Sequence, residues 1–191
     1  MALFRSGLAK PIACAFLSVN WLFVLGGFIV SAWLFRRLAY AVTSRSTQYI
    51  GLVGYVLVEG LIFVPLLFVA ERHFPGVIQV AATVTLLGFG SLSYVVFRTR
   101  RDFSFLEPFL SWAGLMALVL IIAACLFGLH LGLWFSIAMI VIAGAAILHD
   151  TSRILFHFAD DQYAAAALEL FASVALLFWY VVDILGWDWS D

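Results

Sequence analysis

Charged residues are scarce in this chain. Of its 191 residues only 11% are Asp, Glu, Lys or Arg, whereas soluble domains contain about 25%. Hydrophobic residues make up 65%, and the mean hydropathy is +1.12. This composition excludes a soluble enzyme and predicts a single helical domain in a membrane. The net charge of -1 and the lack of a basic block give no sign of a nucleic-acid partner.

Cysteine is also rare, and both cysteines lie in apolar runs. We interpret Cys14 and Cys125 as small core residues rather than as a disulfide or metal ligands. No cofactor or metal site is predicted. The first apolar run continues to Phe35 and stops at Arg36 and Arg37, which is too long for the core of a cleaved signal peptide. We therefore expect it to be a retained helix.

Long hydrophobic runs are abundant, and each approaches the roughly 20 residues that a membrane-spanning helix needs. They do not alternate between apolar and polar residues as the strands of a membrane barrel do. The sequence therefore predicts an all-α polytopic membrane protein with membrane lipid as its surroundings. The six expected helices cover residues 12–35, 47–70, 76–97, 106–127, 129–149 and 162–186.

The positive charges are distributed unevenly between the two sides of these helices. The connections after the first, third and fifth helices contain Arg36, Arg37, Arg45, Arg98, Arg100, Arg101 and Arg153, whereas the other side has Arg5, Lys10 and Arg72. Cytoplasmic loops are enriched in Lys and Arg. We therefore expect both termini of this chain outside, in a bacterial inner membrane.

Ionisable residues at membrane depth are functional candidates, because a charge inside the bilayer is costly. Glu59 lies in the middle of the second predicted helix, near Gly60 and Pro65. It is either a protonated or hydrogen-bonded structural acid or a pore or proton site. Gly60 and Pro65 favour the second interpretation, since Pro65 frees a backbone carbonyl and Gly60 lets another helix approach.

A second group of polar residues ends the fifth predicted helix. Asp150 is followed at helical spacing by Arg153 and His157, and His149 precedes it. The simplest interpretation is an interfacial ion pair between Asp150 and Arg153, worth under about 1 kcal/mol if solvated. Metal binding by the two histidines and Asp150 is not favoured, because their spacing matches no known site.

The last predicted helix has Glu169 and Ser173 one turn apart on one face, and Asp183 near its outer end. Two acids that face one another across helices share a proton, because like charges raise one pKa. Such a pair would give a pH-dependent gate. An intramembrane aspartyl protease also needs two acids, but the chain lacks the Gly-x-Gly-Asp motif, so we expect no enzymatic activity.

Several segments in order resemble the Bax inhibitor-1 family of membrane proteins. "ILHDTSRI" (Ile147–Ile154) is similar to the segment that closes the sixth of that family's seven helices, and "FRTRRDFSFL" (Phe97–Leu106) to its basic loop. "DQYAAAALELFASVALLFWYVVDILG" resembles its last helix, and "GYVLVEGLIFVPLL" an earlier one. The resemblance covers about Trp21 to Gly186 and implies helices arranged around a central one.

Two departures from the family pattern affect the expected site. The resemblance begins at the family's second helix, so the first of seven is expected to be missing from this chain. Many members have an aspartate on each of the last two helices; Asp150 matches the first, but the second position holds Ser173. We hypothesise that Glu169, one turn earlier, replaces the missing aspartate.

The resemblance implies two classes of function. One is a pH-sensitive cation (calcium) leak, in which Asp150 holds the cytoplasmic mouth shut through Arg153 and opens it when protonated. Glu59 would then bind permeant calcium or protons at mid-membrane, and His149 or His157 would tune the response. The other is a non-transporting stress-response regulator that binds a membrane-anchored AAA protease or another partner. A conventional transporter is not expected, because the chain shows no internal repeat.

Overall fold

The computed structural model describes residues 21–40, 44–129, 131–158 and 162–187. These residues form six α-helices and one short 3-10 helix, with no strand among them. Five of the helices are long and apolar enough to cross a membrane, which confirms the all-α polytopic membrane class. The predicted helix over residues 12–35 is described only from Trp21 onward.

The chain divides into two compact units between Ile78 and Gln79. Helices α3 (Trp21–Ala39) and α4 (Arg45–His73) form the first unit. Helices α6 (Glu107–Phe127), α7 (Gly132–Phe156) and α8 (Tyr163–Trp187) belong to the second, together with the 3-10 helix η1 (Ser104–Leu106) and nearly all of α5 (Val77–Thr99).

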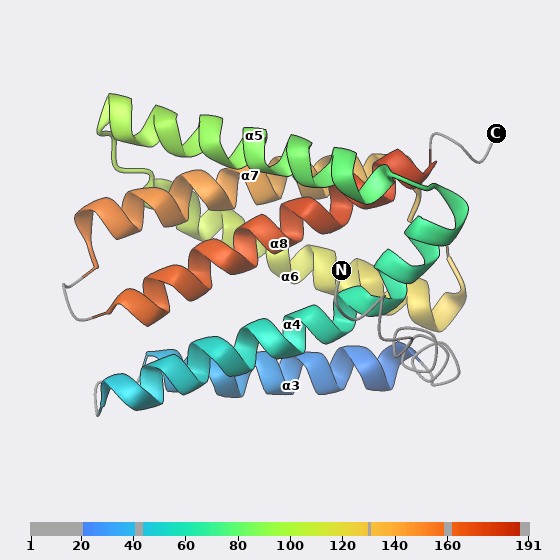
Figure 1. Cartoon of the computed structure of the whole chain (residues 1–191), viewed down its shortest axis with the longest axis horizontal. Coiled ribbons are helices and arrows are strands. Elements are labelled where there is room, and N and C mark those ends of the chain that lie inside the picture. The colour runs from blue at the N-terminus through green and yellow to red at the C-terminus, as the bar shows by residue number, and fades with distance from the viewer. Residues whose placement is uncertain (1–20, 41–43, 130, 159–161, 188–191) are drawn as a thin grey trace. The chain divides into compact units, whose positions relative to one another are not determined.

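The first unit is a helical hairpin in which α3 and α4 lie side by side (Figure 1). Ser44 caps α4, because its hydroxyl accepts a hydrogen bond from the Thr47 N–H at 3.2 Å. Close approach of the two helices depends on Gly51, where a Cβ atom would overlap the backbone of Phe35 and Ala39. The glycine therefore sets the distance between α3 and α4.

Helix α4 contains Pro65 and still continues to His73. Proline removes one backbone hydrogen bond and bends a helix, and α4 changes direction in its second half (Figure 1). Helix α4 begins two residues before its predicted range and ends three residues after it, because Arg45, Arg72 and His73 form helical turns beyond the apolar run.

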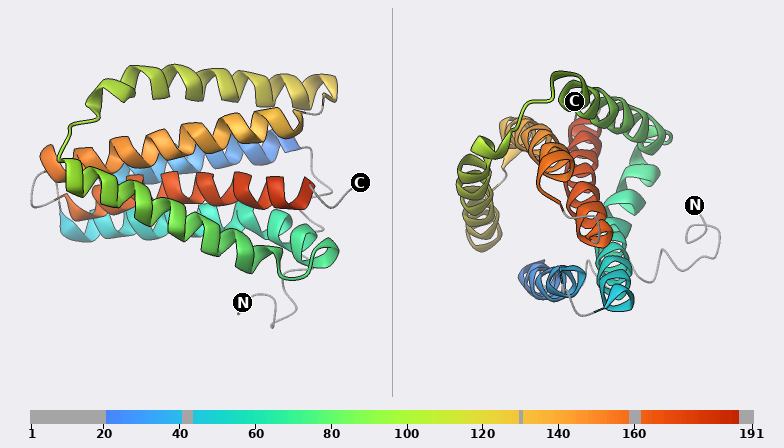
Figure 2. Two further views of the ribbon diagram at one scale, coloured as in Figure 1. Left: turned by 90° about the horizontal axis from the view of Figure 1, so that it is seen from above. Right: turned by 90° about the vertical axis from the view of Figure 1, so that its left-hand side faces the viewer.

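In the second unit α7 lies between α6 and α8 (Figure 2). Small and branched side chains of α7 and α8 are fully buried in this unit: Ala143, Ile147, Ala165 and Leu168. Farther along the pair, the rings of Phe135 and Tyr180 meet edge to face with centroids 5.9 Å apart. This packing fixes the position of α7 against α8, and the polar residues of both helices with it.

Left-handed backbone conformations mark two of the helix ends in the second unit. Gly128 ends α6 with φ of 65°, as is usual for a glycine after a helix. Arg100 has φ of 48° just after α5, and its N–H donates to the Val96 carbonyl oxygen at 2.8 Å. The chain thus turns sharply out of α5 toward η1, which brings the predicted basic loop back to α7.

Candidate functional site

The candidate site lies at the end of α7, which extends beyond its predicted range. The expected helix stopped at His149, but α7 continues to Phe156. The polar residues after Ile147 include no glycine or proline that would end a helix, so the helix continues through them. His149 and Asp150 are therefore buried helical residues, 5% and 9% exposed, rather than residues of an interfacial loop.

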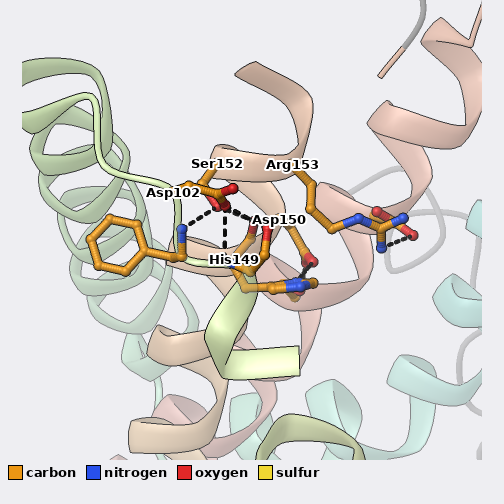
Figure 3. Close-up of polar contacts among 9 residues, drawn as sticks. Asp102, His149, Asp150, Ser152 and Arg153 are labelled. Atoms are coloured by element: carbon orange, nitrogen blue, oxygen red, sulfur yellow. Dashed lines mark hydrogen bonds and ion pairs between the residues drawn. The ribbon is translucent and has the colours of Figure 1, made fainter. Parts of the chain in front are cut away.

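Asp150 accepts hydrogen bonds from two neighbours. The Ser173 hydroxyl of α8 donates to its Oδ2 atom, and Nδ1 of His149 lies 3.1 Å from its Oδ1 atom. Figure 3 shows His149 and Asp150 among the polar contacts of this region. The residue at the family's second aspartate position thus faces Asp150, but as a hydroxyl donor rather than as a second acid.

Arg153 does not pair with Asp150, contrary to the simplest expectation. Its Nη1 atom donates to Oε1 of Glu169 at 3.2 Å, and its side chain runs away from Asp150 (Figure 3). Positions three apart on a helix are neighbours, but α8 offers Arg153 an acid of its own. In this structure Glu169 therefore pairs with a cation, and the hypothesis that it replaces the missing aspartate stays untested.

The loop after α5 is bound to the same end of α7. Phe103 donates its backbone N–H to the Ser152 hydroxyl at 3.2 Å, and that hydroxyl donates to the His149 carbonyl oxygen at 2.8 Å. The Ser93 and Thr151 hydroxyls lie 3.3 Å apart, which joins α5 to α7. These contacts enclose the buried His149–Asp150 pair from the side of α5 and η1.

Asp102 forms an exposed polar group over this end of α7. The backbone N–H and the hydroxyl of Ser104 both donate to its Oδ1 atom, and Nε2 of His157 lies 3.6 Å from Oδ2. The pKa of Asp102 lies below its ordinary range, chiefly because the Ser104 hydroxyl and then the Ser104 N–H stabilise the charged form. His157, predicted as a tuning residue, is thus half-exposed and faces Asp102.

We expect the Ser104 amide resonance to report the charge of Asp102. Because the folded-state pKa of Asp102 is lowered, the turn is stabilised above the ordinary pKa of aspartate and loses this stabilisation as pH falls through the lowered value. An NMR titration of the Ser104 amide checks this, with Asp102→Asn as the variant that removes the transition. A midpoint above about 3.9, the ordinary aspartate pKa, would contradict the prediction.

Glu59, the predicted mid-membrane acid, lies in the first unit and is buried. The Tyr55 hydroxyl, one turn earlier on α4, is hydrogen-bonded to its carboxyl group, and Arg36 of α3 interacts with it electrostatically. Oε2 of Glu59 has no hydrogen-bond partner among the described residues. Glu59 therefore belongs to a polar group of the α3–α4 hairpin, whereas the Asp150 site belongs to the second unit.

Several residues that contact the Asp150 site or join its helices were not predicted from the sequence. Ser152 and Asp102 lie inside two of the segments that resemble the family, but neither was given a role, and Ser93 lies in no quoted segment. Ser136 of α7 donates to Oδ2 of Asp183 at 2.5 Å, so Asp183 is bound to α7. The usable signal was the presence of single hydroxyl residues in otherwise apolar helices, since such groups pair when buried.

The chemistry available to the Asp150 site is proton binding. The Ser173 hydroxyl is bound to the carboxylate and not to the imidazole, so the three residues do not form the arrangement that activates a serine nucleophile. In the described part of the chain no three His, Cys, Asp or Glu residues gather as a metal site. A buried carboxylate with a hydroxyl donor and an imidazole is suited to exchange a proton.

These features define a polytopic helical membrane protein with a buried acid site shared by its last two helices. The chain belongs to the Bax inhibitor-1 family: the family model "Inhibitor of apoptosis-promoting Bax1" matches residues 1–188. This confirms the resemblance seen in the sequence.

Among its relatives is "Modulator of FtsH protease YccA" of Escherichia coli K12, 32% identical over 159 residues, or 81% of this chain and 71% of the relative. The protein of Escherichia coli O6:H1 with the same identity and coverage is named "Inner membrane protein YccA". A membrane protein of Vibrio cholerae is 31% identical over 143 residues, covering 72% of this chain and 60% of the relative.

Proposed function

We propose that this chain is an inner-membrane regulator that modulates a membrane-anchored, ATP-dependent protease of the FtsH type. The observation that supports the proposal most strongly is the match over 81% of the chain to a protein named as a modulator of that protease. The chain itself catalyses no reaction in this proposal. Its role is to bind the protease in the membrane and change the rate at which substrates are degraded.

The proposed orientation places the arginine-rich helix ends in the cytoplasm and both termini of this chain outside. Arg36 and Arg37 lie in the last turn of α3, Arg98 in that of α5 and Arg153 in that of α7. Cytoplasmic enrichment of arginine supports this direction. The contact surface for the protease is then the loop after α5 with the end of α7, next to the Asp150 site.

Co-purification of the full chain with FtsH from inner membranes tests this proposal, together with degradation of a membrane substrate in proteoliposomes. The expected result is a complex and a changed degradation rate. The variant Arg101→Gln removes the charge of an exposed arginine in the proposed contact loop. It is expected to weaken the complex without unfolding the chain. An unchanged degradation rate with no complex would exclude the modulator proposal.

A second candidate function, a proton-gated cation (calcium) leak, is favoured by one observation: the buried carboxylate of Asp150 bridges α7 and α8 through Ser173. In this mechanism the charged carboxylate holds the two helices together, and protonation weakens that bond. Calcium flux into liposomes that contain the purified chain is the test. No flux at any pH would exclude the leak while leaving the modulator proposal intact.

The role of Glu169 is tested by Glu169→Gln. Because Glu169 pairs with Arg153, we expect the variant to keep the parent's pH dependence of flux or protease modulation. We also expect it to unfold more easily by about 1–3 kcal/mol, since Arg153 loses a partly buried, charge-assisted bond. Thermal unfolding in detergent measures the second effect. A shifted pH dependence would instead support Glu169 as the replacement for the missing aspartate.

A further inference from the structure

His149 is the residue of the Asp150 site whose hydrogen bonding is incomplete. Its side chain is only 6% exposed, and its Nδ1 atom lies 3.1 Å from Oδ1 of Asp150. The other ring nitrogen, Nε2, is buried and has no hydrogen-bond partner among the described residues. Buried polar atoms in proteins are almost always paired, so an exception calls for an explanation.

The contacts of Asp150 fix which nitrogen holds the ring proton. A charged carboxylate only accepts hydrogen bonds, so Nδ1 of a neutral His149 must be the N–H that faces it. Nε2 then has a free lone pair and is basic. When Nε2 takes up a proton, both ring nitrogens are N–H donors, and Nδ1 still faces the carboxylate of Asp150.

We propose that His149 is a proton-binding site that delivers protons to Asp150. A proton binds to Nε2, and the imidazolium passes its Nδ1 proton to Oδ1 of Asp150. The ring is then neutral with its hydrogen on Nε2, and the carboxyl group is a neutral acid. One proton enters and none leaves, so the charge of the site changes from negative to neutral.

The proposed proton transfer from His149 to Asp150 connects proton uptake to the contact between α7 and α8. Ser173 of α8 donates to the other carboxylate oxygen of Asp150, Oδ2. A hydrogen bond to a charged acceptor is roughly twice as strong as one to a neutral group. Protonation through His149 therefore weakens the bond between α7 and α8, although no group on α8 needs to titrate.

Charged groups lie around His149 on α7, on α8 and in the loop after α5. On α7 itself the neighbours are Asp150 and Arg153, and α8 contributes Glu169, which pairs with Arg153. The loop after α5 contributes Asp102, which interacts electrostatically with both His149 and His157. Arg153 therefore has an acid partner of its own, and Asp150 and Asp102 are the carboxylates that interact with the ring.

The test uses the full chain in lipid nanodiscs with ¹⁵N-labelled histidine. We expect the ring resonances of His149 to titrate between about pH 5 and 8, the range in which imidazoles usually change charge, with the low-pH tautomer carrying its hydrogen on Nε2. The Asp150→Asn variant has no carboxylate to receive the Nδ1 proton, so the change of tautomer at low pH is not expected in it. A His149 ring whose resonances do not change over this range would overturn the proposal.

A second measurement uses His149→Asn, because the asparagine amide retains a donor near the Nδ1 position but has no second basic nitrogen. Proton uptake between about pH 8 and 5 is expected to fall by about one proton per chain relative to the parent, with the Asp150–Ser173 bond retained. His157→Asn is the matched control; it removes an exposed imidazole and is expected to leave the ring resonances of His149 unchanged. Equal proton uptake in the parent and in His149→Asn would overturn the proposal.

The proposal deepens the pH response suggested for the Asp150 site and rests on that site being functional. Its readouts are ring resonances and proton counts, which need neither calcium flux nor a protease. Titration of His149 without either activity would therefore refute the proposed functions and leave the proton site standing. Calcium flux or protease modulation in a protein whose His149 resonances do not change with pH would refute the proton site and leave the proposed functions standing.

Discussion

Asp150→Asn is expected to abolish the pH response of the protein while preserving the helix pair. Asparagine has nearly the same shape as aspartate, and its amide oxygen accepts one of the hydrogen bonds that Ser173 and His149 donate to Asp150. The amide binds no proton in the physiological range. Calcium flux and protease modulation, measured from about pH 5 to 8, are expected no longer to depend on pH. The free energy of unfolding is expected to fall by about 1–3 kcal/mol.

The same helix pair offers a matched control for this substitution. Asp183 on α8 is bound to the Ser136 hydroxyl of α7 at the other end of the pair. Asp183→Asn removes a carboxylate with the same kind of partner and is expected to leave the pH response intact. If Asp183→Asn lost the pH response and Asp150→Asn kept it, the proton-sensitive group would be Asp183. That result would refute the assignment of the pH response to Asp150.

Gly51→Ala is expected to separate α3 from α4. The added methyl group would overlap backbone atoms of Phe35 and Ala39, which cannot move aside as a flexible side chain does. Overpacking of this kind usually destabilises by about 1–3 kcal/mol. Thermal unfolding of the purified chain in detergent, followed by circular dichroism, measures the effect.

Gly60→Ala in the same helix is the control for Gly51→Ala. A Cβ atom at Gly60 meets nothing within 4 Å, and alanine favours a helix over glycine by about 1 kcal/mol. We therefore expect unchanged or slightly raised stability. If both variants lose equal stability, the effect comes from glycine flexibility in α4 rather than from the close approach to α3.

The helices could be predicted from the sequence because a membrane imposes a minimum length on apolar runs. The end of α7 could not, because His149, Asp150 and Arg153 look like residues of a loop when judged by polarity alone. The structure retains them in the helix, since neighbouring segments supply their partners. Hydropathy therefore locates a span well but places its end poorly where polar residues are buried.

The partners in the site were only partly predictable. Ser173 was placed opposite Asp150 by the resemblance to the family, and the structure brings the two together. The local spacing rule suggested Arg153 for Asp150, but Arg153 pairs with Glu169 from another helix. Spacing within one helix contains no information about what a neighbouring helix offers. The contact of Phe103 with Ser152 was missed for the same reason.

The two hydroxyl–carboxylate bonds between α7 and α8 have a mechanical consequence. Because Asp150–Ser173 and Ser136–Asp183 lie at opposite ends of the pair, sliding one helix along the other would break both at once. Protonation of Asp150 weakens only one of the two bonds, so the bond between Ser136 and Asp183 still joins the helices. Spin labels at the two ends would then report unequal changes in separation, large near Asp150 and small near Asp183.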